Sequence, residues 1–267
     1  MTNTTKDEVL ESMVQYSSVW KVLVAELPGA DLEDKPGLSI SWADSPFPFW
    51  NAVFLTESSI NAMQLKNRLR EAALYVRQKR QAGLVYVCEE YLTSSTKAAL
   101  PSALAEAKLE LSLPVHGMAG NILPLMESSH PTLRMRRVTD EAQLMVYADI
   151  NCEGYGFLPD WGRIGLRGTR LWTEGAYSYL GYEGDHPVCA ASAIAHDANL
   201  YLALVATRPN AQRKGYGEAI VRHALQSAHD CTGLSRTILH ASDAGFPVYR
   251  RVGYHKTASI LAYKLSG

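Results

Sequence analysis

The chain has 267 residues, of which 47% are hydrophobic and 20% charged, the proportions of an ordinary globular protein. Its formal net charge of −1 provides no basic field, so we expect no nucleic-acid partner. No segment reaches the ~20 apolar residues of a membrane span, and the N-terminus lacks the pattern of a signal peptide. We therefore expect no membrane partner.

The cysteines are spaced too widely to form a metal site or a disulfide framework of a familiar kind. There are four of them, and no two make a CxxC pair: Cys88, Cys152, Cys189 and Cys231. Scattered thiols without an export signal are typical of a reducing compartment. The sequence therefore predicts no metal and a cytoplasmic location.

The first half of the chain is predicted to mix helices and strands. Apolar spacing predicts a helix over residues 5–27 and a second one over residues 60–81, capped by Ser58 or Ser59. A third helix is expected around residues 96–108, with its start near Pro101. Apolar runs predict strands at residues 38–42, 52–56, 84–88, 109–115 and 118–125. No chemical motif occurs in this half, and its aromatic cluster between Trp42 and Asn51 is interpreted as packing.

A polar segment that ends in proline, residues 127–131, predicts a boundary between two domains, 1–130 and 133–267. A strand is expected directly after the boundary, followed by a helix capped by Thr139 or Asp140. An antiparallel meander, a helix after a basic loop, and a closing strand–helix–strand complete the second half. Strands are expected at 133–138, 177–182, 188–195, 199–207, 236–241 and 255–265. Helices are expected at 215–229 and 246–252. The sum predicts an α/β fold with a mixed sheet.

The loop that follows the strand at 199–207 carries the most chemical information. Its last six residues, Gln212-Arg213-Lys214-Gly215-Tyr216-Gly217, open a helix, whose first N–H groups and dipole favour an anion. The glycines allow a phosphate to approach the backbone closely, and the two basic side chains add positive charge. This pattern predicts a pyrophosphate cradle, and it matches neither a Walker loop nor a dinucleotide fingerprint. The alternative is a helix start whose glycines serve only close packing.

This loop resembles the [Q/R]xxGx[G/A] signature of the GNAT N-acetyltransferases, with Gln212, Gly215 and Gly217 at the defined positions. A second resemblance is Tyr249, which stands four residues before Gly253 in the place of a family tyrosine that precedes Gly-Phe. Tyr254 departs from the commoner Phe. The element order from 133 to 265 also agrees, so the second half is identified as similar to the GNAT acyl-CoA N-acyltransferase fold. The first half is interpreted as a degenerate copy of this fold or as an unrelated α+β helper domain.

The resemblance implies acetyl-CoA as co-substrate and a site for each of its parts. Backbone groups of Leu204, Val205 and Thr207 would bind the pantetheine arm, the cradle would bind the pyrophosphate, and Ser242 would contact the arm. The cradle residues are Gln212, Arg213, Lys214, Gly215, Tyr216 and Gly217. Tyr249 would act as the general acid that protonates the departing CoA thiolate. The alternative for Tyr249 is a buried aromatic residue with a satisfied hydroxyl.

No general base is evident, because residues 199–211 contain no carboxylate. Glu153 and Asp197 are candidates by proximity alone, and His240 is interpreted as a packed histidine. A proton relayed by solvent, or an amine that arrives neutral, would need no base. The missing carboxylate also motivates an alternative function, a non-catalytic acyl-CoA sensor.

The acceptor is expected to be a small-molecule or peptide amine that receives the acetyl group at a primary amine. Tyr155, Trp161 and Trp172 are the candidate binding residues, and the acids Glu153, Asp160 and Glu174 flank them. Aromatic faces and carboxylates could hold an ammonium group by cation–π and charge contacts. A helical core with exposed acids explains the same residues equally well. By analogy with the family, a homodimer is possible.

Overall fold

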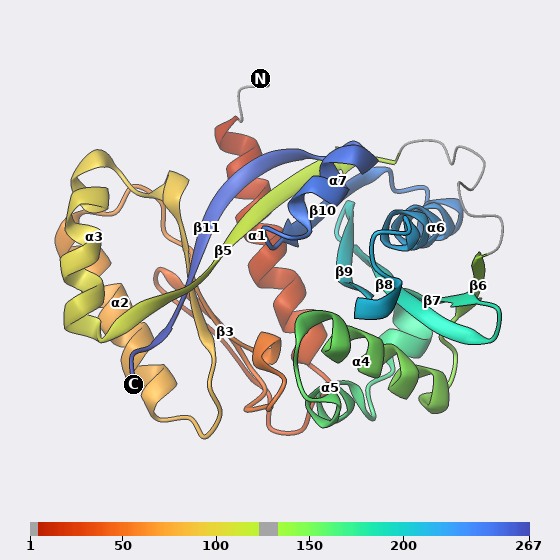
Figure 1. Cartoon of the computed structure of the whole chain (residues 1–267). Coiled ribbons are helices and arrows are strands. Elements are labelled where there is room, and N and C mark those ends of the chain that lie inside the picture. Colours follow the sequence, from red (N-terminus) through yellow and green to blue (C-terminus); the bar gives the residue numbers. More distant parts are fainter. Residues whose placement is uncertain (1–4, 123–132) are drawn as a thin grey trace. The chain divides into compact units, whose positions relative to one another are not determined.

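The computed structural model describes residues 5–122 and 133–267 (Figure 1). None of the helices in these ranges has the length and apolar character that a membrane span requires. The chain forms two compact units, and the predicted boundary segment 127–131 lies outside the described residues. The first unit comprises Met1–Met118, His240–Asp243 and Lys256–Gly267; the second comprises Ala119–Leu239 and Ala244–His255. The units therefore differ from the two halves of the chain, because the last strand belongs to the first unit.

The first unit begins with a helix and three consecutive strands, after which helices and strands alternate. The strands β1, β2 and β3 form an antiparallel meander, β3 pairs with β4 in parallel, and β4 pairs with β11 in antiparallel fashion. The elements in chain order are α1 (Lys6–Val24), β1 (Asp31–Lys35), β2 (Leu38–Trp42), β3 (Asn51–Leu55), α2 (Ala62–Arg77), β4 (Leu84–Cys88), α3 (Ser94–Ala107), β5 (Leu109–Asn121) and β11 (His255–Leu265). The two strands predicted between residues 109 and 125 are thus one strand, β5.

Two helix starts in this unit differ from the prediction because a better cap precedes each helix. Asn61 caps α2 instead of Ser58 or Ser59, and its side chain accepts a hydrogen bond from Gln64 N at 2.9 Å. Thr93 caps α3, so this helix begins well before Pro101. Pro101 lies inside the helix, where it removes one N–H donor from the ladder, and the cap at Thr93 determines the start.

The second unit contains the predicted meander. Strands β6, β7, β8 and β9 pair in antiparallel fashion, and β9 pairs with β10 in parallel. Its elements are β6 (Leu133–Arg137), α4 (Glu141–Tyr155), α5 (Pro159–Leu166), a π-helical turn (Leu171–Gly175), β7 (Tyr177–Glu183), β8 (His186–His196), β9 (Asn199–Thr207), α6 (Tyr216–Thr232), β10 (Arg236–Ala241) and α7 (Phe246–Val252). The predicted α/β fold with mixed strand pairing is confirmed, and α5 is a helix that the apolar spacing did not indicate.

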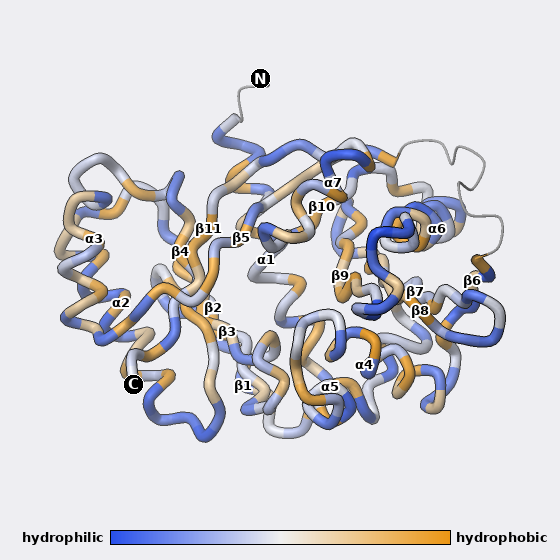
Figure 2. The backbone as a smooth tube through the Cα atoms, viewed as in Figure 1, coloured by the Kyte–Doolittle hydropathy of each residue, from blue (hydrophilic) through white to orange (hydrophobic). Residues whose placement is uncertain are grey.

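The same order of elements occurs twice in the chain. The run β3–α2–β4–α3–β5 repeats the run β9–α6–β10–α7–β11, and in each run a helix connects two parallel strands. Strands β2, β3 and β4 are buried along their whole length, and Figure 2 shows long hydrophobic stretches on the central strands. A strand covered on both faces can be apolar along its whole length, as β4 is (Leu-Val-Tyr-Val-Cys), whereas β2 alternates apolar residues with serine.

Candidate functional site

The cradle begins where β9 ends and α6 starts. Gly215 is the N-cap of α6 and adopts a left-handed conformation with φ of +82°, and Arg213 has φ of +62°. Having no side chain, Gly215 cannot accept the N–H groups of the first turn of α6. These groups remain directed out of the helix, where its dipole favours an anion. The start of α6 therefore has the uncapped N–H groups that the predicted cradle requires, and anion binding there stays a prediction.

Charged side chains surround this helix start, and one of them was not recognised from the sequence. Arg213 and Lys214 are exposed. Glu183, at the end of β7, accepts a hydrogen bond from the Tyr216 hydroxyl at 2.5 Å and one from Lys214 Nζ at 3.3 Å. The hydrogen bond from Tyr216 lowers the pKa of Glu183, and Lys214 adds to this effect. Thirty-one residues separate Glu183 from Lys214, so no local pattern points to it.

Strand β9 carries a bulge at the residues predicted to bind the pantetheine arm. Ala203 pairs with Ser192 and Ala206 with Ala190, so Leu204 and Val205 face the single residue Ala191. Leu204 has φ of +47°, which is strained for a residue with a side chain. On the other side, β9 pairs with β10 at Leu200 and Tyr201, which precede this bulge in the strand.

The turn after β9 is closed by Gln212. Its side-chain Nε2 donates a hydrogen bond to Thr207 O at 3.2 Å. This bond connects the end of β9 to the segment that opens the cradle. Gln212 thus supports the loop backbone, and Thr207 is placed beside the helix start: a Cβ on Gly217 would lie 3.4 Å from Thr207 Oγ1.

Tyr249 lies on α7 and is partly buried. Its ring contacts that of Tyr254 edge to face, with the centroids 5.9 Å apart. Burial raises the pKa of Tyr249 well above its usual range, and the phenols of Tyr155 and Tyr254 add to this effect. Within the described residues no hydrogen bond occupies its hydroxyl. Tyr249 is therefore a neutral phenol that keeps its proton at physiological pH, as a general acid must.

The two carboxylates considered as a general base, Glu153 and Asp197, both lie beside a basic side chain. Glu153 forms a short ion pair with Arg208, which also donates to Pro187 O at 2.8 Å. Asp197 lies in the turn between β8 and β9, 3.6 Å from His196. Through Arg208, which follows β9, Glu153 stabilises the end of this strand. Asp197 contacts His196 in the turn, and no contact links it to a catalytic role.

His240 is a packed histidine, as predicted. Its ring stacks on that of Tyr16 with centroids 3.7 Å apart, and its Nε2 lies 3.1 Å from Ser12 Oγ. All three residues belong to the first unit. Burial lowers the pKa of His240 to about 3. The ring is therefore neutral at physiological pH, and its stacking on Tyr16 helps to pack α1.

The predicted acceptor residues differ in how far their side chains are exposed. Tyr155, at the end of α4, is 37% exposed, and its ring is 6.2 Å from that of Phe157, which is 6.1 Å from Trp161. Trp172 is fully buried and lies 6.0 Å from Tyr147. The π-helical turn places its indole in the core, so an acceptor contact for Trp172 stays a prediction that its burial does not support. Phe157 completes the aromatic row instead.

The remaining acceptor-side and cofactor residues have less specific surroundings. Asp160 is largely exposed and lies 3.8 Å from Arg163. Ser242 follows β10 and belongs to the first unit, whereas the cradle belongs to the second. A cofactor contact for Ser242 stays a prediction. Among the described residues, no group of three or more His, Cys, Asp or Glu side chains could hold a metal ion.

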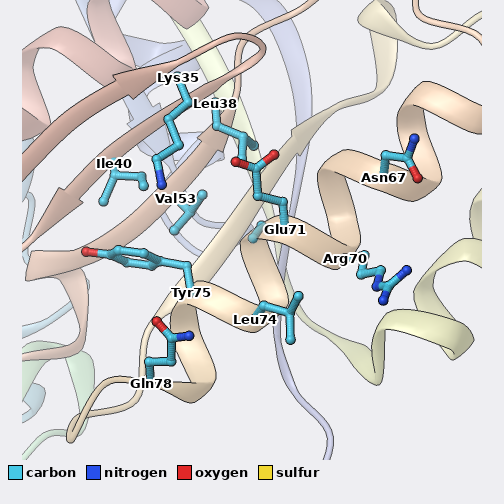
Figure 3. A pocket seen from close by; sticks show the side chains of 11 residues that line it. Lys35, Leu38, Ile40, Val53, Asn67, Arg70, Glu71, Leu74, Tyr75 and Gln78 are labelled. Atoms are coloured by element: carbon cyan, nitrogen blue, oxygen red, sulfur yellow. The ribbon is translucent and has the colours of Figure 1, made fainter.

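The first unit contains a cavity of about 300 Å³ between α2 and the strands β2 and β3 (Figure 3). Its apolar wall includes Leu38, Ile40 and Val53. Three of the polar groups at its rim have partners: Lys35 lies 3.2 Å from Glu33, Glu71 lies 3.4 Å from Arg68, and the Tyr75 hydroxyl donates to Asp31 at 2.6 Å. We assign no ligand to this cavity.

Comparison with known proteins matches part of the second half of the chain to a protein family. Residues 167–262 match the model of the acetyltransferase (GNAT) domain. No curated protein sequence matches the chain. Solved structures match nearly all of it in fold.

Three of these solved structures are representative. A GCN5-related N-acetyltransferase from Kribbella flavida has a TM-score of 0.70 at 16% identity, with 96% of this chain and 95% of the other covered. One from Sphaerobacter thermophilus has a TM-score of 0.59 at 13% identity, with 80% and 71% covered. A putative GNAT-family acetyltransferase from Novosphingobium aromaticivorans has a TM-score of 0.58 at 10% identity, with 96% and 97% covered. At these identities the likeness concerns the fold.

Proposed function

We propose that this chain, which carries a GNAT acetyltransferase domain at residues 167–262, transfers the acetyl group of acetyl-CoA to a primary amine. The family and the fold support acyl transfer in general. The observation that carries the proposal further is the start of α6, where Gly215 leaves the first N–H groups uncapped beside Arg213 and Lys214. Such a site suits a pyrophosphate, because backbone donors, the helix dipole and two cations act on the same anion.

The donor would lie along β9, with its pyrophosphate at the cradle. Leu204, Val205 and Thr207 would bind the pantetheine arm through backbone groups, since β9 pairs with β10 only before the bulge among the described residues. Gln212 supports this arrangement by its hydrogen bond to Thr207 O. The thioester would then lie beyond the bulge, further along β9 from the cradle.

The reaction is a direct attack of the amine on the thioester. The amine nitrogen forms a bond to the acetyl carbon, the carbon–sulfur bond breaks, and the thiolate takes the phenolic proton of Tyr249. The ammonium proton of the product passes to water, and the Tyr249 phenolate recovers a proton from solvent. Because the pKa of Tyr249 is raised, the phenol is protonated before each turnover. Positioned acids of this kind contribute roughly 10²–10⁴ in rate.

The acceptor amine would bind at the aromatic row formed by Tyr155, Phe157 and Trp161. The row is partly exposed, and Asp160 nearby adds a carboxylate. Aromatic faces and a carboxylate attract an ammonium group. The amine must lose its proton before attack, and solvent serves as the base because Glu153 is held by Arg208.

The first half is proposed to be a copy of the GNAT fold that has lost acetyl-CoA binding. The repeated order of elements supports a copy. The helix start supports the loss: α2, which occupies the place of α6 in the repeat, has a capping box in which Asn61 and Gln64 accept each other's backbone N–H groups. A capping box occupies the donors that an anion would need. At the corresponding place α6 has Gly215.

Isothermal titration with acetyl-CoA tests the donor site. The wild type should bind, and Gly215→Asp should not, because its carboxylate would lie in the cradle. The matched control is Gly233→Asp at the other end of α6, where the glycine is also left-handed, with φ of +73°; it carries the same backbone strain and should still bind. A wild type that does not bind at millimolar acetyl-CoA would overturn the proposal.

Tyr249→Phe separates the enzyme from the alternative, a non-catalytic acyl-CoA sensor. In an enzyme, this variant should have a turnover rate about 10²- to 10⁴-fold lower with a panel of primary amines, and its affinity for acetyl-CoA should not change. Tyr254→Phe, which changes the neighbouring phenol, should keep most of the activity. A wild type that binds acetyl-CoA and acetylates none of the amines favours the sensor.

A further inference from the structure

Two phenols from one helix hold two consecutive carbonyl groups of the β9 bulge. The hydroxyl of Tyr147 donates to Leu204 O, and that of Tyr155 donates to Val205 O, both at 3.0 Å. Tyr147 and Tyr155 both belong to α4. In an extended strand, consecutive carbonyls point to opposite neighbours. Here two consecutive carbonyl groups accept hydrogen bonds from the same helix, so the backbone between them is not in the regular extended conformation.

The bulge needs such support because its backbone is strained. Leu204 adopts φ of +47°, a conformation that a residue with a side chain keeps only where its surroundings impose it. In the bulge, two residues of β9 face one residue of β8, so the ladder to β8 is interrupted there. The carbonyls that lose their place in the ladder must find other donors when buried. Tyr147 and Tyr155 are those donors.

The surroundings of Tyr147 fix its hydroxyl in place. Its side chain is fully buried, and its oxygen lies 2.7 Å from Ser192 Oγ, which lies 2.8 Å from Ser178 Oγ. This row of hydroxyls runs from α4 through β8 to β7. A buried network in which each hydroxyl has partners is rigid, so the position of Leu204 O is set by the sheet as well as by α4.

Helix α4 reaches the bulge because small residues line the contact. A Cβ on Gly154 would lie 2.9 Å from the Cβ of Ala206, so the absence of a side chain lets α4 approach β9 closely. Tyr155, the next residue, then extends along the strand to Val205 O.

We propose that Tyr147 and Tyr155, which we name the phenol clamp, are positioning residues for the acyl donor. The clamp holds the carbonyls of Leu204 and Val205 toward α4, so that the bulged segment presents a fixed set of backbone groups to the pantetheine arm. The inference rests on the proposed function, because it takes β9 as the binding strand for that arm. It assigns Tyr155 a task at the donor in addition to its place in the aromatic row.

Tyr155→Phe and Tyr147→Phe test the clamp, since each removes a single hydroxyl. The matched control is Tyr179→Phe, which removes a phenol hydroxyl that donates to Ser227 Oγ at 3.0 Å in the same unit. Titrations use acetyl-CoA and 3′-phospho-ADP, which has the pyrophosphate but lacks the pantetheine arm. Each clamp variant should bind acetyl-CoA about three- to tenfold more weakly, the usual effect of one hydrogen bond, and bind 3′-phospho-ADP as the wild type does.

Hydrogen exchange in the free protein provides a readout that needs no ligand. The amides of residues 203–207 should exchange faster in both clamp variants and at the wild-type rate in Tyr179→Phe. Unchanged exchange in the clamp variants overturns the proposal. An equal loss of affinity for both ligands also overturns it, because it indicates a general loss of structure. A wild type that binds neither ligand overturns the proposed function, and exchange then still decides whether the clamp holds the bulge.

Discussion

Gly154 on α4 lies directly against Ala206 on β9. A Cβ on residue 154 would stand 2.9 Å from the Cβ of Ala206 and 3.6 Å from the backbone N of Thr207. Real Cβ contacts are longer than the first of these distances, so the pair sets the separation between the helix and the strand. Because Ala206 and Thr207 lead from the bulge toward the cradle, this contact connects helix packing to the donor site.

Gly154→Ala should therefore destabilise the protein, although alanine favours helices. In an open helix the change would add roughly 0.5–1 kcal/mol of stability, whereas overpacking costs about 1–3 kcal/mol. We expect the free energy of unfolding to fall by about 1 kcal/mol in urea titrations and acetyl-CoA to bind more weakly. An increase in stability would show that α4 shifts freely and that the close contact with Ala206 is unimportant.

Gly217→Ala should have the opposite outcome, although the residue belongs to the cradle. The added Cβ would lie 3.4 Å from Thr207 Oγ1, an ordinary contact, and residue 217 is helical. The stability should stay the same or rise by up to about 1 kcal/mol, with acetyl-CoA binding retained in a calorimetric titration. Loss of binding would mean that the pyrophosphate approaches the backbone at residue 217 and that only glycine allows it.

Glu183→Gln should strengthen acetyl-CoA binding. Glu183 faces Lys214 and accepts from Tyr216, so its charge opposes an anion in the cradle, whereas glutamine keeps an acceptor for Tyr216. We expect the affinity to rise about two- to fivefold at low salt, as is typical of exposed charge pairs. The difference should shrink as salt screens it. Weaker binding would show instead that Glu183 is needed to position Lys214.

His240 should make the protein sensitive to acid. Its pKa is lowered to about 3 by burial, so the unfolded chain binds a proton more readily than the folded one. Stability is then lost as the pH falls from about 6.5, the usual value for histidine, toward 3. His240→Phe keeps a ring against Tyr16 and should lose less stability between pH 6.5 and 4 in urea titrations. His186→Asn, at an exposed position, should follow the wild type.

Much of the fold was predictable because its signals are local. The strands at 38–42, 84–88 and 236–241 coincide with the expected ranges, since apolar runs between turns specify buried strands without reference to the rest of the chain. The start of α6 was predictable for a similar reason: the glycines and basic residues that form it are contiguous. Caps were less predictable, because Asn61 and Ser58 both satisfy the rule and only packing decides between them.

What the sequence by itself determined is thus most of the helices and strands and the glycine-containing start of α6; the cofactor contact at Gly215 and the acid role of Tyr249 stay predictions. The tertiary structure alone decided that Trp172 is a core residue, that Arg208 binds Glu153, and that β11 pairs with β4 of the first unit. It also decided the bulge at Leu204. These features depend on residues far apart in the chain, whose contacts follow from packing and strand pairing. Local periodicity, the signal that a sequence displays directly, carries no information about such partners.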